Sequence, residues 1–88
     1  MNEIFLTKYY HVLEILNQYT VQLETEEFCP IKQDKVAELV NLSRISVNKI
    51  FIVLREQGYI EMISREKWKV TPKGKHVIAV ISNFKEEG

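Results

Sequence analysis

The sequence predicts a small α+β domain built around one helix at residues 43–57, and three features of the chain support this prediction. The first is a pair of local signals at the two ends of that helix. The second is an apolar pattern at residues 60–70 that is typical of a β-hairpin. The third is helical periodicity at about residues 4–23 and again after residue 71. The expected order is therefore helix, short strand, two helices joined by a turn, hairpin and C-terminal helix.

The length and composition of the chain fit a single folded domain over residues 1–88. The apolar fraction of 45% and the charged fraction of 27% are ordinary for a soluble protein, and the length allows one core. No apolar run approaches the roughly 20 residues that a membrane span requires. Glu3 makes the N-terminus unlike a secretory signal, and the single Cys29 cannot form an internal disulfide. We therefore expect a cytoplasmic protein that has no membrane partner.

The formal net charge is zero, but the charges are unevenly distributed along the chain. Residues 1–31 carry one Lys against five Glu, whereas residues 44–75 carry eight Lys and Arg against three Glu, a local balance of +5. Because the field at a surface depends on the charges nearby, the second segment can form a phosphate-facing surface in a neutral protein. A solvated surface of mixed charge is the alternative.

The helix at residues 43–57 has a signal at each end. Ser43 is a typical N-cap, because its hydroxyl can accept a hydrogen bond from a free N–H of the first turn. Gly58 can adopt the left-handed conformation that ends a helix. Between these two residues, apolar residues at spacings of three and four predict one buried face, formed by Val47, Ile50, Phe51 and Leu54.

Polar side chains crowd the other faces of the first half of this helix. They are Arg44, Ser46, Asn48 and Lys49. Arg and Lys can donate to guanine, and Asn can pair with adenine through two hydrogen bonds. The pattern predicts a helix whose first turns enter a DNA major groove, and an ordinary solvated helix face is the alternative. Ile45 in the same turn can meet a thymine methyl group or belong to the core.

The segments before this helix predict two further helices and one short strand. Residues 4–23 carry a broad apolar arc, which we expect either to be buried between neighbouring helices or to support self-association. Residues 28–31 are largely apolar, and Pro30 favours extended backbone before it, which is typical of a small edge strand. A short helix at residues 36–40 and a turn at Asn41 then precede the capped helix.

The segments after Gly58 predict a hairpin and a last helix. Apolar residues flank a polar turn at residues 64–67, which indicates a β-hairpin at residues 60–70. Thr71 and Pro72 are typical of the cap and the first residue of a helix. This last helix carries a second broad apolar face, formed by Val77, Ile78, Val80, Ile81 and Phe84. Two such faces near the ends of the chain favour a homodimer that forms through the first and last helices.

Four stretches of the chain fall in a recognisable order. They are Val36-Ala37-Glu38-Leu39-Val40-Asn41-Leu42-Ser43, then Ser46-Val47 with Lys49, then Leu54-Arg55-Glu56-Gln57-Gly58-Tyr59-Ile60, and finally Val70-Thr71-Pro72-Lys73-Gly74-Lys75. Together they resemble a winged helix-turn-helix domain, of the broad group that includes the MarR-type bacterial regulators. The resemblance spans most of the chain. It implies that the helix at about residues 43–57 binds DNA, with the hairpin at residues 60–70 as the wing.

Cations at the tip of the expected wing are further candidates for DNA contact. Arg65 and Lys67 can reach a phosphate or the minor groove, although Glu66 between them repels the same backbone. Trp68 beside them is either a stacking surface or a residue that packs in the core.

The sequence predicts no enzyme. His11 and His76 have no spaced partner for catalysis or metal binding, and three glycines form no phosphate-binding loop. Cys29 lies in a short apolar segment, which is more typical of a buried structural thiol than of a reactive one. We therefore expect no metal and no cofactor.

These features predict a sequence-specific, double-stranded DNA-binding transcriptional regulator that acts as a homodimer. Two alternatives stay open. A winged-helix protein-interaction module would use the apolar Ile52 and Val53 as a partner surface, and the net charge of zero favours it. A replication or plasmid-maintenance factor would bind DNA through the same physics.

Overall fold

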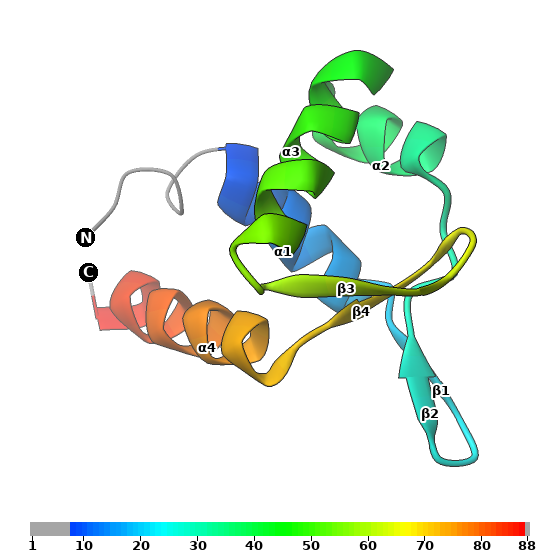
Figure 1. Cartoon of the computed structure of the whole chain (residues 1–88). Helices are drawn as coiled ribbons and strands as arrows, with labels where there is room; N and C mark the ends of the chain where they lie inside the picture. Colours follow the sequence, from blue (N-terminus) through cyan, green and yellow to red (C-terminus); the bar gives the residue numbers. More distant parts are fainter. Residues whose placement is uncertain (1–7, 88) are drawn as a thin grey trace.

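A computed structural model of the chain describes residues 8–87, with side chains placed for residues 8–83. Within this range the protein is a small α+β domain with four helices and two antiparallel hairpins (Figure 1). The α+β class is the predicted one, but the sequence analysis expected one hairpin and a single short strand in place of the β1–β2 hairpin. The elements follow the order α1 (Lys8–Gln18), β1 (Val21–Leu23), β2 (Glu26–Phe28), α2 (Gln33–Val40), α3 (Arg44–Glu56), β3 (Ile60–Ser64), β4 (Lys67–Val70) and α4 (Pro72–Glu87).

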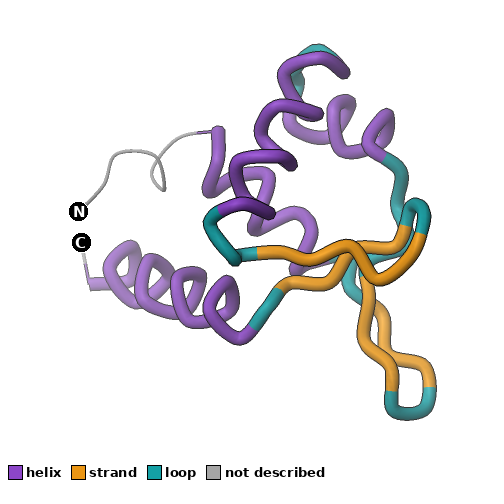
Figure 2. The backbone as a smooth tube through the Cα atoms, in the orientation of Figure 1, coloured by secondary structure: helices purple, strands orange, loops and turns teal. Residues whose placement is uncertain are grey.

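The two hairpins are joined by a single bridge. In the β3–β4 hairpin, Ile60 lies opposite Val70 and Met62 lies opposite Trp68, with an irregularity in register just before the turn. Just beyond β2, the N–H of Cys29 donates to the carbonyl oxygen of Trp68 at 2.6 Å, and the N–H of Trp68 donates back at 3.2 Å. The β1–β2 hairpin is therefore attached near its base, and its turn projects away from the helices (Figure 2).

The prediction for the first helix was wrong at its C-terminal end. The helix ends at Gln18, and residues 21–23 form a strand that pairs with residues 26–28. The expected edge strand at residues 28–31 is thus replaced by a strand that lies further towards the N-terminus. The residues Tyr19, Val21 and Leu23 also alternate with polar residues, so an apolar set that we assigned to helical spacing fits a strand equally well. Residues 4–7 of the predicted helix lie outside the described residues.

The apolar arc of the first helix is buried inside this one chain. Val12, Leu13, Ile15 and Leu16 all belong to the hydrophobic core, where α1 packs against α2, α3, α4 and β4. Of the two alternatives for this arc, burial between neighbouring helices is the one that the described part of α1 adopts.

Trp68 is a core residue and not a stacking surface, because only 8% of it is exposed. Its ring meets the ring of Phe51 edge to face, with the ring centres 4.8 Å apart and the planes at 85°. This arrangement is a favoured geometry for aromatic pairs. The contact fixes the buried face of α3 against the β3–β4 hairpin.

The local signals for helix ends are confirmed. The Ser46 N–H donates to the hydroxyl of Ser43 at 3.1 Å, and Gly58 follows α3 with φ +81°. Asn41 adopts the left-handed conformation between α2 and α3, with φ 58°. At the start of α4, the Thr71 hydroxyl accepts from the N–H of Gly74 at 3.1 Å and donates to the carbonyl oxygen of Gly58 at 2.6 Å. Thr71 therefore caps α4 and ties it to the end of α3.

We expect Gly74→Ala to destabilise the fold, although alanine is the better helix former by about 1 kcal/mol. A Cβ at this position would overlap the carbonyl oxygen of Tyr59 and come within 2.8 Å of Val70 Cγ1. The Tyr59 oxygen cannot easily move away, because it accepts from the N–H of Thr71 at 3.1 Å. Overpacking of this kind costs about 1–3 kcal/mol, so the free energy of unfolding in a denaturant titration should fall.

The matched control is Gly58→Ala, where a Cβ would meet only the flexible end of Lys73. Its cost should be about 1 kcal/mol, from the left-handed backbone alone. If Gly74→Ala is as stable as the parent, the close approach of α4 to Tyr59 is not as described.

Candidate nucleic-acid interface

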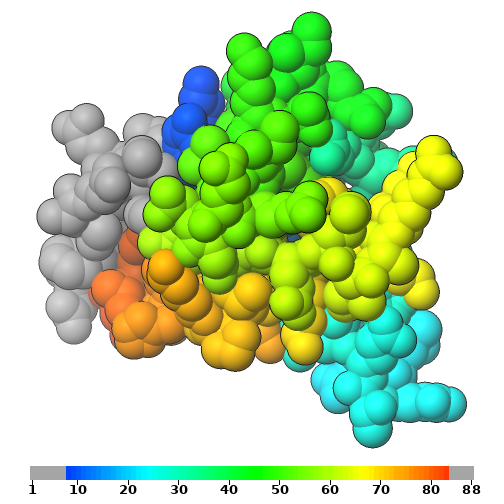
Figure 3. Space-filling view, in the orientation of Figure 1, coloured from blue at the N-terminus to red at the C-terminus, as the bar shows by residue number. Residues whose placement is uncertain are grey.

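The α3 helix has one buried face and one exposed face. Its buried face is formed by the four residues that the sequence predicts, Val47, Ile50, Phe51 and Leu54. Of the candidate contact residues, Arg44, Asn48 and Lys49 are exposed. Figure 3 shows α3 (green) beside the β3–β4 hairpin (yellow-green to yellow) on one face of the molecule. This face combines polar and cationic side chains in the first half of α3.

Ile45 lies on the same exposed face and not in the core, because 71% of it is accessible. Of its two predicted alternatives, the core position is therefore wrong. Ile52, which lies two helical turns after Ile45, is 48% exposed. An apolar side chain this exposed contributes little to folding, since most of its surface stays in water.

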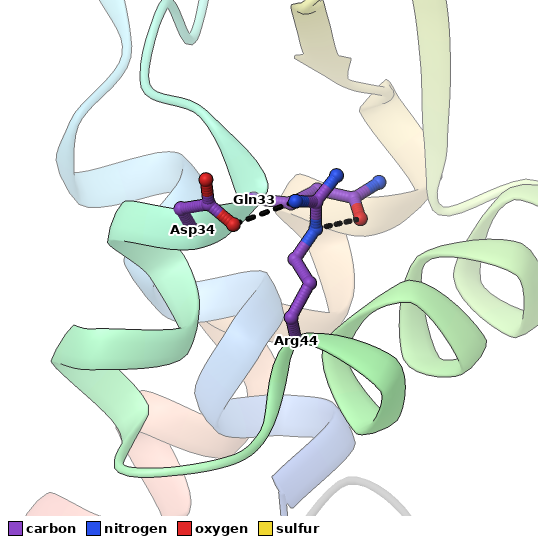
Figure 4. Close-up of polar contacts among 3 residues, drawn as sticks. All are labelled: Gln33, Asp34 and Arg44. Carbon is purple, nitrogen blue, oxygen red and sulfur yellow. Dashed lines mark hydrogen bonds and ion pairs between the residues drawn. The ribbon is translucent and has the colours of Figure 1, made fainter.

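Arg44 is held at the start of α3 by two residues from the start of α2 (Figure 4). Its Nη1 atom lies 2.6 Å from Oδ1 of Asp34, and its Nε–H donates to Oε1 of Gln33 at 3.3 Å. The Arg44 and Asp34 side chains remain 59% and 73% exposed. The guanidinium is therefore oriented by two acceptors while much of it stays accessible.

Ser46 is partly used by the helix cap. It is half-buried, its N–H donates to the Ser43 hydroxyl, and its own hydroxyl oxygen accepts from the Ser43 hydroxyl at 3.0 Å. Its hydroxyl proton can still be donated to another acceptor. Ser46 is thus a structural residue that borders the exposed face.

The two cations near the β3–β4 turn have different surroundings. Arg65 and Glu66 form the turn itself, and both are exposed. Lys67, two residues after Arg65, has its Nζ atom 4.6 Å from the centre of the Phe28 ring, which is a cation–π contact with β2. Lys67 is therefore directed towards the other hairpin.

Arg44 and Arg65 line one recess of about 340 Å³ between the starts of α2 and α3 and the β3–β4 turn. Its lining residues are Lys32, Gln33, Asp34, Arg44, Arg65, Glu66 and Trp68. The tertiary structure thus brings together three cations from separate segments of the chain, Lys32, Arg44 and Arg65, with the carboxylates of Asp34 and Glu66 among them. Asn48, Lys49 and Lys67 do not line this recess.

The sequence analysis missed Lys32, Gln33 and Asp34 as members of this group. They precede or begin α2, where polar residues are common for reasons of helix initiation alone. No spacing rule connects Gln33 with Arg44, because the two residues meet only through the packing of α2 on α3.

Two other cations of the basic segment serve the fold on the side of α4. Lys75 forms an ion pair with Glu27 of β2. Lys73 donates to the carbonyl oxygen of Gln57 at 2.7 Å and lies 4.7 Å from the ring centre of Tyr59. The charge balance of +5 over residues 44–75 therefore overstates what the face around α3 presents.

The remaining candidate groups are structural or isolated. Cys29 is fully buried, and this burial raises the pKa of its thiol, as expected for a structural cysteine. Burial also raises the pKa of the Tyr10 phenol, although a hydrogen bond from Ser82 opposes the shift. Over residues 8–87, no group of three or more His, Cys, Asp or Glu residues could hold a metal ion. The helices in the same range are all too short or too polar to cross a membrane.

Comparisons with known proteins found no matching family model, no matching curated protein and no matching solved structure. The function is therefore inferred from the geometry and chemistry of α3, its neighbours and the β3–β4 hairpin.

Proposed function

We propose that this protein is a winged helix-turn-helix transcriptional regulator that binds double-stranded DNA and acts by occupying an operator. In this proposal α2 and α3 form the helix-turn-helix, α3 is the recognition helix and the β3–β4 hairpin is the wing. The observation that carries the proposal is the exposed face of α3, where Arg44, Asn48 and Lys49 lie over a fully apolar buried face.

The first turns of α3 offer the chemistry that base edges in a major groove require. A major groove about 12 Å wide admits one helix, whose N-terminal residues then reach the bases. Arg44 and Lys49 can donate to guanine O6 and N7, and Asn48 can pair with adenine N6 and N7. Ser46 has a hydroxyl proton left for a phosphate or a base. Ile45 supplies an apolar contact of the kind that a thymine methyl group accepts.

The wing supplies phosphate contacts in this proposal. Arg65 lines the same recess as Arg44, so a duplex that enters beside α3 would pass both side chains. Lys67, whose ammonium lies over the Phe28 ring, adds positive charge beside the turn. Glu66 in the turn repels the phosphate backbone. These contacts position the protein on the duplex without reading its sequence.

A winged-helix protein-interaction module is the second candidate function. It is favoured by the exposure of Ile52, Met62 and Ile63 on α3 and β3, of which Ile52 is 48% and Met62 45% accessible. Exposed apolar side chains on adjacent elements are typical of a surface that binds another protein. The net charge of zero agrees with this candidate.

We also propose that the regulator is a homodimer with two-fold symmetry, so that two recognition helices meet one operator. The described part of α1 has its apolar face in the core, which leaves α4 as the better surface. Val80 on α4 is 38% exposed, and Val77 and Ile78 are half-buried. Residues 4–7 of the predicted first helix and the side chain of Phe84 lie outside the described side chains.

We expect the protein to bind duplex DNA with a strong dependence on salt, because phosphate contacts by Lys and Arg release counterions. With about four such contacts, the affinity should fall on the order of 100-fold between 50 and 200 mM monovalent salt. The measurement is a fluorescence-anisotropy titration of a random-sequence duplex library. Absence of binding at 50 mM salt would reject the DNA proposal and favour the interaction module.

We expect Arg44→Ala and Lys49→Ala to weaken specific binding while the fold is retained. Both side chains project from the exposed face, so the free energy of unfolding should change by less than about 0.5 kcal/mol. Loss of a base contact should cost about 1–3 kcal/mol of binding free energy at particular positions of a selected site. Lys8→Ala, which removes an exposed lysine from α1, is the control. If both α3 variants bind like the parent, another surface is responsible.

We expect Ile45 to sense the methyl group of one thymine. Replacing thymines of a selected site one at a time by deoxyuridine removes this methyl group alone, which should weaken the parent about 4-fold at that position. Ile45→Ala should abolish the difference, and Ile52→Ala should preserve it. A parent that binds both forms of the site equally at every position contradicts this role of Ile45.

We expect Val80→Glu to shift the protein from dimer to monomer in sedimentation at micromolar concentration, because a charge would be buried at the two-fold interface. Leu23→Glu on β1, where the side chain is 61% exposed, is the control and should leave the assembly unchanged. A two-fold dimer should also prefer inverted half-sites about one helical turn apart. A parent that sediments as a monomer and protects a single half-site at all concentrations rules out the dimer.

A further inference from the structure

Arg44 differs from the other exposed polar residues of α3 because a separate helix determines its orientation. Gln33 and Asp34, the first two residues of α2, supply one acceptor each to its guanidinium (Figure 4). The three side chains converge at the rim of the recess that Arg65 and Lys32 also line. This convergence depends on the packing of α2 on α3 and has no counterpart at Asn48 or Lys49 in the hydrogen bonds described above.

The two contacts leave enough donors on Arg44 for a bidentate contact with a base. A guanidinium has five N–H groups, of which Nε–H goes to Gln33 and one on Nη1 goes to Asp34. Three N–H groups remain, two of them on Nη2. Guanine needs two of these for its O6 and N7 atoms.

Asp34 lies in the first turn of α2, where a carboxylate suits the helix dipole, but its ion pair with Arg44 is explained neither by stability nor by phosphate binding. Its side chain is 73% exposed and that of Arg44 is 59% exposed, and ion pairs as exposed as this contribute little to folding. A carboxylate beside a phosphate-binding surface also repels the DNA backbone. The contact of its carboxylate with the Arg44 guanidinium is explained if Asp34 sets the orientation of that side chain.

We propose that Asp34 and Gln33 are positioning residues that orient Arg44 towards guanine and keep it from binding the nearest phosphate. This inference rests on the proposed function. A free arginine loses rotamer freedom when it binds a base, and it can reach a phosphate instead. An arginine that is already oriented loses less freedom, and its contact with Asp34 competes with phosphate contact. The consequence is a larger ratio of specific to non-specific affinity, since specificity is a difference between two affinities.

The test compares four proteins on two duplexes. The full chain first selects a site from a random duplex library, and this site and a scrambled version of the same composition are then the probes. The proteins are the parent, Asp34→Ala, Asp34→Asn and the control Glu38→Ala, which removes the same charge from another exposed position of α2. Unfolding by denaturant is measured for each protein, so that a loss of fold is detected independently of binding.

We expect Asp34→Ala to raise the affinity for the scrambled duplex and to lower the ratio of specific to scrambled affinity roughly 5-fold or more. Asp34→Asn loses the same charge but retains an amide oxygen that can accept from Arg44, so it should keep most of this ratio. Glu38→Ala should raise both affinities together. Charge alone would make Asp34→Ala and Asp34→Asn equal, so the difference between these two variants reports positioning.

A second measurement identifies the base. Substituting 7-deazaguanine for each guanine of the selected site in turn removes the N7 acceptor. The affinity of the parent protein for the site should fall at one of these positions. In Asp34→Ala the same substitution should have a smaller effect. The order parameter of the Arg44 Nε–H group in the free protein should fall in Gln33→Ala, which tests the orientation without DNA.

Two results would overturn the inference in distinguishable ways. If the parent binds no duplex, the proposed function and this inference fail together. If the parent selects a site but Asp34→Ala preserves the affinity ratio and the sensitivity to 7-deazaguanine, the DNA-binding function stands and the positioning role is rejected.

Discussion

The packing of Trp68 is the interaction on which the rest of this structure depends. Its ring meets Phe51 of α3, its backbone bonds Cys29 next to β2, and its strand pairs with β3. One residue therefore joins the central helix, the projecting hairpin and the β3–β4 hairpin. Because the Phe51 side of α3 is occupied in this way, the opposite side of the helix is left to solvent. The orientation of the proposed recognition face is thus a consequence of core packing.

Electrostatics divides the basic segment of the chain into two parts with different uses. Lys73 and Lys75 are bound to Gln57 and Glu27, so these two cations hold α4 against the rest of the molecule. Arg44 and Arg65 remain around the recess beside α3, although Asp34 and Glu66 lower the net charge there. A surface on which carboxylates lie among the cations depends more on oriented contacts than on the general attraction of DNA. This is the physical setting in which positioning of a single arginine becomes important.

The exposed apolar residues create a real competition between the two proposed functions. Ile45 stands alone among polar neighbours in the first turn of α3, which suits a contact with one methyl group. Ile52, Met62 and Ile63 lie on adjacent elements, where they favour a protein partner. The two uses are compatible in space only if the apolar residues of β3 stay at the margin of a bound duplex. For this reason the DNA-binding experiments decide between functions and not merely between residues.

The sequence by itself determined those parts of this protein that depend on short-range chemistry. Ser43, Gly58 and Thr71 mark helix ends because each satisfies or terminates a backbone hydrogen-bond pattern within a few residues. The buried face of α3 follows from helical spacing alone. The same local reasoning failed at residues 19–23, where the apolar residues fit both a helix and a strand and pairing with residues 26–28 decided the outcome. Only the tertiary structure decided that Ile45 is exposed, that Trp68 is buried and that Asp34 and Gln33 bind Arg44. These outcomes depend on which elements pack together, and residues ten or more positions apart carry no local signal of that packing.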